Sequence, residues 1–225
     1  MDLEKLKRIQ EELAKNVVLQ DYIKPEEIKF VIGVDQSFIG EKKIISACVV
    51  LTFPDLREFS NNVRIEDVKF PYIPTFLMFR EGDPAVNVIK DALKEVDKEN
   101  TVVLVDGSGI AHPRRCGLAT YIALKLKIPT IGVTKRKLFG EVIYPKKVME
   151  ATPIYDKNEV IGYALKPCKM CNPIFISPGS YITPKTALEI VMRCIKGHKL
   201  PEPIRLAHEL ATKSKSQSLS FFIDI

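Results

Sequence analysis

Three long strand-like runs follow one another in the first third of the chain, and this order restricts the fold more than any other feature. The runs cover residues 30–39, 44–53 and 59–70, and each is rich in β-branched and aromatic residues. Residues 40–43 join the first two runs, a connection short enough for an antiparallel hairpin. A meander of this kind followed by alternating helices and strands is typical of a mixed α/β sheet.

The rest of the 225-residue chain alternates between helical and strand-like segments. Proline ends the third run, because it cannot donate a hydrogen bond to a strand ladder. Further helices are expected over residues 3–17, 74–96, 118–126, 184–196 and 202–213, and further strands over residues 102–105, 130–133, 141–144, 160–165 and 174–176. The order predicts an α/β fold, three antiparallel strands and then parallel ones flanked by helices. We expect one domain over residues 1–225 that ends in a tail, residues 213–225.

Positive charge is concentrated in one segment of the chain. The formal net charge is +6, yet residues 112–147 contain nine basic residues and one acidic residue and so carry +8. The remaining residues are therefore slightly negative. A basic segment of this kind indicates a surface for an anionic partner such as nucleic acid, although a solvated lysine-rich face is the simpler alternative. The apolar content of 46% excludes an intrinsically disordered chain.

The sequence contains no apolar run long enough for a membrane helix, and a cytoplasmic location with no membrane contact is expected. Five cysteines are interpreted as reduced thiols rather than as a disulfide framework. The pair Cys168 and Cys171 has the spacing of a metal-binding motif. Cys194 and His198 do not repeat that pair, so a four-ligand zinc site is not favoured.

Two apolar strand segments end in an aspartate. Asp35 follows residues 30–34, and Asp106 follows residues 102–105. An unpaired carboxylate is costly to bury, and two carboxylates on neighbouring strands would repel one another. Mg²⁺ would neutralise both, because it prefers oxygen ligands and keeps waters that a substrate phosphate can replace. The alternative is that each aspartate simply bonds to a turn or a nearby lysine.

Two further polar residues are candidates for the same site only because the two aspartates are there. Glu81 lies in the helix expected after the third strand, and His208 lies in the last expected helix. Either residue alone is more often structural or superficial than functional. Together with Asp35 and Asp106 they would outline a metal-dependent site for cleaving phosphodiesters.

These residues belong to sequence blocks that resemble the endonuclease V family, nucleases with an RNase H-like fold that act at inosine. The blocks occur in the family's order over almost the whole chain. They cover residues 33–38, 70–74, 79–82, 105–109, 112–114, 129–135, 177–179 and 201–208. Thr75 and Met78 replace smaller residues that are often found in the family.

The resemblance implies a metal-dependent endodeoxyribonuclease that uses Mg²⁺, for which Mn²⁺ may substitute. Such an enzyme cleaves the second phosphodiester 3′ to (deoxy)inosine and leaves a 3′-hydroxyl and a 5′-phosphate, in repair of deaminated adenine. Asp35 and Asp106 would hold the metal, while Glu81 and His208 would complete its shell or orient the attacking water. Lys135 would place a positive charge at the scissile phosphate, or would be one more phosphate contact.

The segment Pro71, Tyr72, Ile73 and Pro74 is implied to act as a strand wedge. Two proline rings fix the backbone and hold an aromatic and an aliphatic side chain on a stiff corner. Such a corner could fill or open the stack beside a flipped base. The alternative is a plain sheet-to-helix bend in which Tyr72 is packed.

A base pocket is implied by the same likeness. Hypoxanthine differs from adenine by its 6-keto group and N1 proton, and from guanine by the missing 2-amino group, so backbone donors and acceptors could recognise it. The residues assigned to this pocket are Leu77, Gly107, Leu118, Gly132 and Leu138. Those assigned to the nucleic-acid backbone are His112, Arg114, Arg136 and Lys137, with a structural loop role equally open for His112 and Arg114.

Other functions remain open from the sequence. An RNase H-like nuclease with structure rather than inosine specificity, and a non-enzymatic nucleic-acid binder, both fit the basic segment. A redox role for Cys168 and Cys171 is a remote alternative. The substrate is expected to be DNA, with RNA also open, and no protein partner is required. The apolar pair Phe221 and Phe222 lacks the glutamine spacing for docking on a sliding clamp, so that interaction is not favoured.

Overall fold

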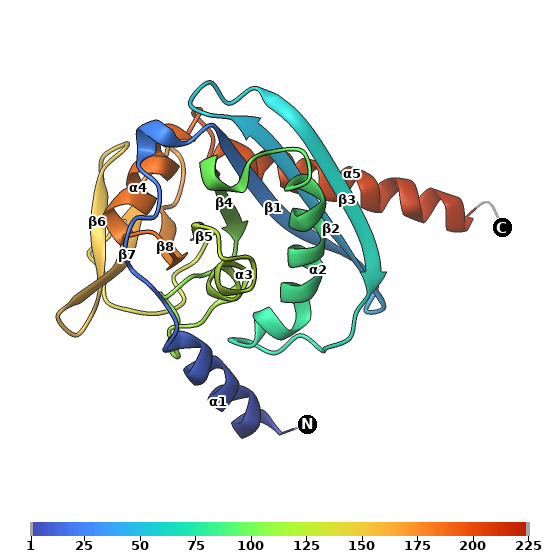
Figure 1. Ribbon diagram of the computed structural model, residues 1–225, viewed down its shortest axis with the longest axis horizontal. Coiled ribbons are helices and arrows are strands. Elements are labelled where there is room, and N and C mark those ends of the chain that lie inside the picture. The colour runs from blue at the N-terminus through green and yellow to red at the C-terminus, as the bar shows by residue number, and fades with distance from the viewer. Residues whose placement is uncertain (1, 224–225) are drawn as a thin grey trace.

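One eight-stranded mixed sheet organises the protein, in a computed structural model that describes residues 2–223, with side chains described up to residue 219 (Figure 1). The helices are α1 (Leu3–Ala14), α2 (Leu77–Ala92), α3 (Leu118–Leu126), α4 (Pro184–Arg193) and α5 (Glu202–Ile223). The strands are β1 (Phe30–Ile39), β2 (Lys43–Thr52), β3 (Glu58–Asp67), β4 (Thr101–Asp106), β5 (Thr130–Thr134), β6 (Ala151–Asp156), β7 (Glu159–Leu165) and β8 (Ile174–Ser180). Short 3-10 turns lie at Pro25–Glu27 and Lys98–Asn100.

The strand order is β3-β2-β1-β4-β5-β8-β7-β6. The first three strands pair antiparallel, while β1, β4 and β5 pair parallel at the centre. This arrangement confirms the predicted fold class, including the antiparallel meander followed by parallel strands. The last three strands, β8, β7 and β6, extend the sheet antiparallel beyond β5.

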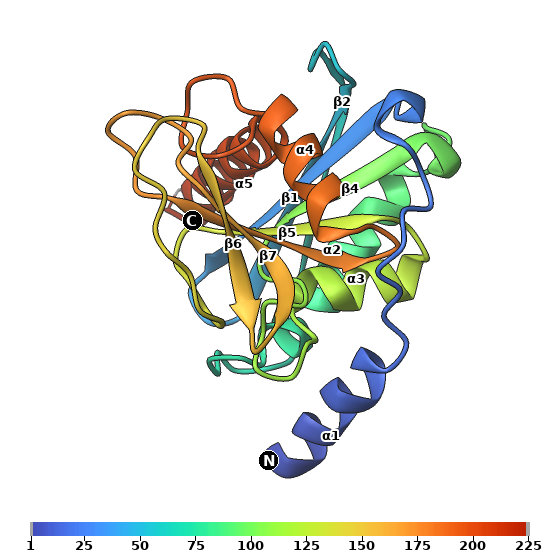
Figure 2. The same cartoon turned by 90° about the vertical axis from the view of Figure 1, so that its left-hand side faces the viewer.

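Helices cover both faces of the sheet, so its central strands are buried on both sides and consist of continuous apolar runs. Alternate residues of β1 face opposite layers: Val31 belongs to the core under α4 and α5, and Ile32 to the core under α2 and α3. In β4 the same alternation makes Leu104 face α4 and α5, and Val103 face α2 and α3. In contrast, α1 stands away from the sheet (Figure 2).

Several predicted boundaries were wrong. The segment 141–144 is not a strand, since only Glu141 makes an isolated bridge, to Tyr155. Its partner strand β6 was not predicted, because Pro153 interrupts a short and weakly apolar run. The third strand ends at Asp67 rather than at residue 70, and α2 is shorter than the expected 74–96 helix.

The expected tail is also not a separate segment, because α5 continues without a break to Ile223. No glycine or proline occurs after Pro203 to end the helix. The side chains of Phe221 and Phe222 lie outside the described residues. Among the described residues, no helix is long and apolar enough to cross a membrane.

The prediction of reduced thiols was wrong for one pair. Cys168 and Cys171 form a disulfide, with their Cα atoms 5.1 Å apart, whereas Cys48, Cys116 and Cys194 are buried free thiols. The disulfide uses both sulfurs, so this pair is not a zinc site in the structure. It closes a very short loop, and a cross-link of that kind restricts the unfolded chain only slightly.

Candidate active site

Asp35 and Asp106 lie side by side at the centre of the sheet. In the parallel register of β1 and β4, Val34 pairs with Val105, so each aspartate is the next residue of its strand. Alternate residues of a strand point to the same face of the sheet, and in each strand the aspartate belongs to the set that faces α4 and α5. Neighbouring strands are about 4.8 Å apart. The two carboxylates, which lie 71 positions apart in the sequence, therefore face the same layer.

Helix α5 carries His208 to this point because its first turn rests directly on β1. A Cβ atom on Gly33 would lie 2.0 Å from the backbone oxygen of Pro203, so only glycine permits this contact. From there the helix and the strand each advance about 7 Å, to His208 and Asp35 respectively. The result is a contact of 2.6 Å between His208 Nδ1 and Asp35 Oδ2.

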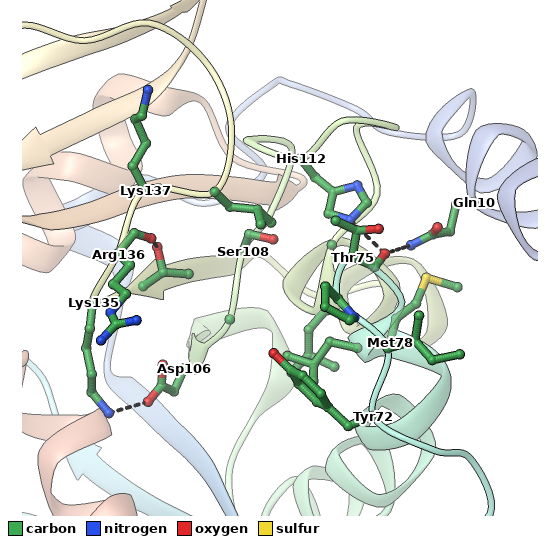
Figure 3. Close-up of a pocket in the computed structure, with 18 residues that line it drawn as sticks. Gln10, Tyr72, Thr75, Met78, Asp106, Ser108, His112, Lys135, Arg136 and Lys137 are labelled. Atoms are coloured by element: carbon green, nitrogen blue, oxygen red, sulfur yellow. Dashed lines mark hydrogen bonds and ion pairs between the residues drawn. The ribbon is translucent and has the colours of Figure 1, made fainter.

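Lys135 follows β5, the next parallel strand, and pairs with the second aspartate. Its Nζ atom lies 2.8 Å from Asp106 Oδ2 (Figure 3). Burial alone would lower the pKa of Lys135, but the Asp106 carboxylate outweighs burial and the net change of the pKa is upward. The ammonium group is therefore charged at neutral pH and lies at the carboxylates, rather than elsewhere on the basic surface.

Glu81 supplies a third carboxyl group, which is buried like that of Asp35, from the second turn of α2. Burial, with the nearby Asp35 and Asp106 carboxylates, raises the pKa of Glu81 to about 8. Burial and Asp106 also raise the pKa of Asp35, although the hydrogen bond from His208 acts in the other direction. Gln36 Nε2 donates to the backbone oxygen of Glu81 at 3.1 Å and so ties α2 to β1. The three acids repel one another at a single place.

This donor set fits a hard divalent cation. A cation between Asp35 and Asp106 would remove the repulsion that raises the pKa of Asp35, and their oxygen atoms are the ligands that Mg²⁺ prefers. Within the described part of the chain, no group of three or more His, Cys, Asp and Glu side chains is arranged to hold a metal. Mg²⁺ does not need such a cage, since it commonly takes one or two carboxylates and completes its shell with water and phosphate.

A cavity of about 540 Å³ opens beside these acids. Asp106 and Lys135 form one end of it, while the segment from Tyr72 to Leu77 forms the opposite wall (Figure 3). Four of the five residues assigned to a base pocket line this cavity, namely Leu77, Gly107, Leu118 and Leu138. A volume of this size is in the range of small-molecule and base-binding sites.

Gly132, the fifth residue assigned to the pocket, does not line the cavity. A Cβ atom there would lie 2.4 Å from the backbone oxygen of Gly107, so its hydrogen side chain lets β5 pack against the loop after β4. Ser177 supports the same loop, accepting a 2.8 Å hydrogen bond from the backbone N–H of Gly109. These two residues shape the cavity from behind.

The segment 71–74 lies at the cavity mouth, between β3 and α2. Tyr72 is 67% exposed, so the alternative in which its ring is packed in a bend is wrong. Ile73 and Pro74 line the cavity together with Tyr72, whereas Pro71 is exposed and does not. An exposed aromatic ring on a proline-stiffened corner beside a cavity has the geometry that a wedge requires.

The four residues assigned to the nucleic-acid backbone divide into two pairs. Arg136 and Lys137 are exposed at the cavity rim, where they can contact an anionic strand. His112 and Arg114 instead direct their ring and guanidinium groups to Thr75. For the second pair the structure favours the structural role that the sequence left open.

Sequence reasoning missed Gln10 and Thr75, which both line the cavity. Gln10 is the one fully buried residue of α1 and occupies its apolar stripe, between the half-buried Leu6 and Leu13. A polar residue on an apolar stripe was the one signal that could have identified it. Thr75 stands out in the sequence only as a departure from the family, because its significance lies mainly in its backbone.

The strand order, with two acids at its centre, defines a protein of the RNase H-like nuclease class. Solved structures agree. Human ENDOV superposes with a TM-score of 0.87 at 26% identity, over 97% of this chain and 100% of that one. Endonuclease V of Ciona intestinalis, in complex with a 24mer DNA containing an inosine followed by a ribo-adenosine, gives a TM-score of 0.82 at 26% identity, over 96% and 98% of the two chains.

The chain belongs to the endonuclease V family, whose model, described as Endonuclease V, matches residues 11–209. A relative from Archaeoglobus fulgidus, named Endonuclease V, is 55% identical over 217 residues, covering 96% of this chain and 95% of its own. Endonuclease V of Dictyoglomus turgidum is 38% identical over 202 residues, covering 89% and 86% respectively. The resemblance found in the sequence blocks is confirmed, and the protein is a nuclease.

Proposed function

We propose that this nuclease is a Mg²⁺-dependent endonuclease that recognises inosine in nucleic acid and acts in the repair of deaminated adenine. By family likeness it cleaves the second phosphodiester 3′ to the altered base and leaves a 3′-hydroxyl and a 5′-phosphate. The observation that carries the proposal is the cavity between the exposed Tyr72 ring and the Asp106–Lys135 pair. It provides a place for a base next to, but not at, a place for phosphate hydrolysis.

The residues of the site divide the work of hydrolysis. Mg²⁺ bound by Asp35 and Asp106 would lower the pKa of a bound water and stabilise charge on the phosphate. Lys135, held at Asp106, presents a fixed positive charge to the same phosphate. His208, held at Asp35, and Glu81, buried beside the two aspartates, would orient water and move a proton.

Recognition of the base is proposed to take place in the cavity. The 6-keto group and N1 proton of hypoxanthine require one donor and one acceptor, which the backbone around Gly107 and Ser108 can offer. Leu77, Leu118 and Leu138 supply apolar walls. Extrusion of the base into the cavity costs least when its pairing is already weak, as it is for inosine opposite thymine.

The substrate class is supported by the Ciona intestinalis protein, whose structure holds inosine-containing DNA. We propose DNA as the principal substrate, with RNA open, because a 2′-hydroxyl contact depends on geometry near the cut site. A cytoplasmic location and activity without a protein partner remain predictions.

A strand-cleavage assay tests the proposal. Labelled duplexes that are identical except for one adenine, deoxyinosine or inosine are incubated with the protein and Mg²⁺, and products are mapped to the nucleotide. We expect cleavage only with the two hypoxanthine substrates, one nucleotide beyond the altered residue on its 3′ side. Equal cleavage of the adenine duplex would instead support a structure-specific nuclease. Cleavage that persists in EDTA would refute the metal assignment.

A further inference from the structure

The backbone carbonyl of Thr75 is a focus of hydrogen bonds immediately after the wedge segment 71–74. It accepts from Gln10 Nε2 at 3.0 Å, from Arg114 Nη2 at 2.9 Å and from the His112 ring nitrogen Nε2 at 3.0 Å. A carbonyl oxygen has two lone pairs, so three donors exceed what an ordinary peptide group attracts. The donors come from α1 and from the loop after β4, far from Thr75 in the sequence.

The three donors also support one another. Arg114 Nε donates to Gln10 Oε1 at 2.6 Å, and Arg114 Nη2 also donates to Thr75 Oγ1 at 2.7 Å. Gln10 Nε2 reaches the Cys116 carbonyl at 3.1 Å, so the amide nitrogen bridges two segments. Charged and buried hydrogen bonds of this kind are the stronger ones, and a partly satisfied network would be costly.

The geometry assigns the protonation of His112. Its Nδ1 accepts the backbone N–H of Arg114 at 3.2 Å, so Nε2 carries the proton and donates to Thr75. Burial lowers the pKa of His112 to about 4, which keeps the ring in this neutral form. Both ring nitrogens are therefore used within the protein.

The held residue has an unfavourable backbone conformation. Thr75 has a φ of +68°, in the left-handed region that β-branched residues rarely adopt. Such a conformation persists only where the surrounding contacts are strong enough to hold it. Residues of this kind cluster at functional sites. Here the contacts are those of Gln10, His112 and Arg114, while Arg114 also stacks on the Phe76 ring, 4.6 Å from its centroid.

We propose that Gln10, His112 and Arg114 are positioning residues for the wedge, acting through Thr75. They form a clamp, defined as these three side chains and the Thr75 backbone, that holds Tyr72 at the cavity mouth. Selection of a base within a stacked duplex thus depends on the N-terminal helix α1, which contacts the cavity through Gln10. This inference rests on the proposed function, because a wedge matters only where a stack must be opened.

The first test compares two substrates with one variant. In Gln10→Glu the side chain keeps its shape and its acceptor for Arg114 but can no longer donate to the carbonyls of Thr75 and Cys116. Of these two bonds, the one to Thr75 adjoins the wedge. We expect single-turnover cleavage of a duplex with one deoxyinosine to fall about tenfold, the effect of one buried hydrogen bond. The same deoxyinosine in a single strand needs no unstacking, and its cleavage should change less than threefold. Equal losses on both substrates would overturn the proposal.

A double-mutant cycle asks whether Gln10 acts through Tyr72. If it does, Gln10→Glu should slow duplex cleavage in the wild-type background but add almost nothing in a Tyr72→Ala background. Full additivity of the two losses would overturn the proposal. Glu12→Gln is the matched control, since Glu12 is an exposed residue of the same helix whose side chain pairs with Lys15.

A measurement without substrate separates this inference from the proposed function. Amide hydrogen exchange of residues 75–79 in the free protein should speed up several-fold in Gln10→Glu and Arg114→Lys, but not in Glu12→Gln. Unchanged exchange in both clamp variants would overturn the clamp. If wild-type protein fails to discriminate inosine while exchange responds as expected, the clamp exists and the proposed function is wrong.

Discussion

His208 Nδ1 lies 2.6 Å from Asp35 Oδ2, which joins the last helix of the protein to its first strand. This contact holds one carboxylate of the central pair, as Lys135 holds the other. Each acid is thus oriented by a nitrogen atom from a different part of the fold, His208 from α5 and Lys135 from the residue after β5. The positions of both nitrogen atoms depend on how these elements pack in the fold. Hydrogen-bond partners that orient metal-binding carboxylates commonly tune metal affinity.

His208→Ala should weaken metal use more than substrate binding. Loss of an orienting partner typically costs ten- to a hundredfold in metal affinity or activity. We expect the Mg²⁺ concentration for half-maximal cleavage to rise by about that factor, while binding of inosine DNA in Ca²⁺ is nearly unchanged. His198→Ala, a change at an exposed histidine of the α4–α5 connection, is the control. An unaltered Mg²⁺ dependence would show that the contact has no role in catalysis.

Asp106→Asn should abolish cleavage and leave binding largely intact. The amide removes one of the two negative ligands but keeps the size of the side chain and a partner for Lys135. We expect a loss of at least about a thousandfold in single-turnover rate, as is usual when an electrostatic group of the reaction centre is removed. Asp67→Asn, at the exposed end of β3, should retain full activity. Substantial cleavage by Asp106→Asn would contradict the metal assignment.

Lys135 and Lys137 should differ although they are two residues apart. Lys135→Ala removes the charge beside Asp106 and should slow the chemical step at saturating protein by about a hundredfold. Lys137→Ala removes an exposed charge at the cavity rim and should weaken binding of the nucleic acid. The slope of log K against log salt concentration should become shallower by about one. Anisotropy titrations at several salt concentrations, with single-turnover kinetics, distinguish the two. If both variants lose rate and binding to the same extent, Lys135 is only a phosphate contact.

Tyr72→Ala should lower discrimination between inosine and adenine duplexes without changing the Mg²⁺ dependence. The aromatic ring provides the bulk that fills the stack, and stacking of a base on an aromatic side chain is worth about 1–3 kcal/mol. We expect duplex cleavage to fall roughly tenfold or more, with Tyr72→Phe close to wild type. Tyr22, which is 64% exposed and contacts Tyr181, provides a matched alanine control. Wild-type activity in Tyr72→Ala would reject the wedge.

The stability of the protein should fall on acidification through His112. Burial lowers its pKa to about 4 in the folded protein, whereas the unfolded chain takes up this proton near pH 6.5. The unfolded state therefore binds more protons between these values, and unfolding becomes easier as the pH drops from about 7 to 4. The contribution is roughly 3 kcal/mol.

Urea unfolding at a series of pH values measures this slope. His112→Gln should show a shallower decline between pH 7 and 4 than the wild type, although it is less stable at pH 7. His198→Gln, which changes an exposed residue, should reproduce the wild-type slope. A wild-type slope in His112→Gln would mean that His112 does not titrate in this range.

The central acids could be predicted from the sequence because they interrupt apolar runs. Asp35 follows the apolar half of β1, which continues to Ile39, and Asp106 ends β4. The register of β1 and β4 then places the two acids together. In contrast, Glu81 and His208 had no local signal that distinguished them from surface residues. Their significance came from the family resemblance and from the packing of α2 and α5.

Features that depend on distant contacts escaped the sequence. The clamp joins Gln10 to Arg114, which lie 104 positions apart, and no periodic pattern encodes such a pairing. Strand β6 was missed because Pro153 breaks its pattern, although an edge strand tolerates proline. The polar composition after residue 213 suggests a tail, yet no glycine or proline ends the helix there, and α5 continues to Ile223.

Gly33 has no side chain of its own to contribute, yet it determines how far the imidazole of α5 can reach. The Pro203 carbonyl fills the space of a Cβ atom at this position, so even one added methyl group would push the start of α5 away from β1. Lifting that end would withdraw His208 from Asp35 while both residues stayed intact. The contact between His208 and Asp35 therefore depends on a residue that takes no part in it.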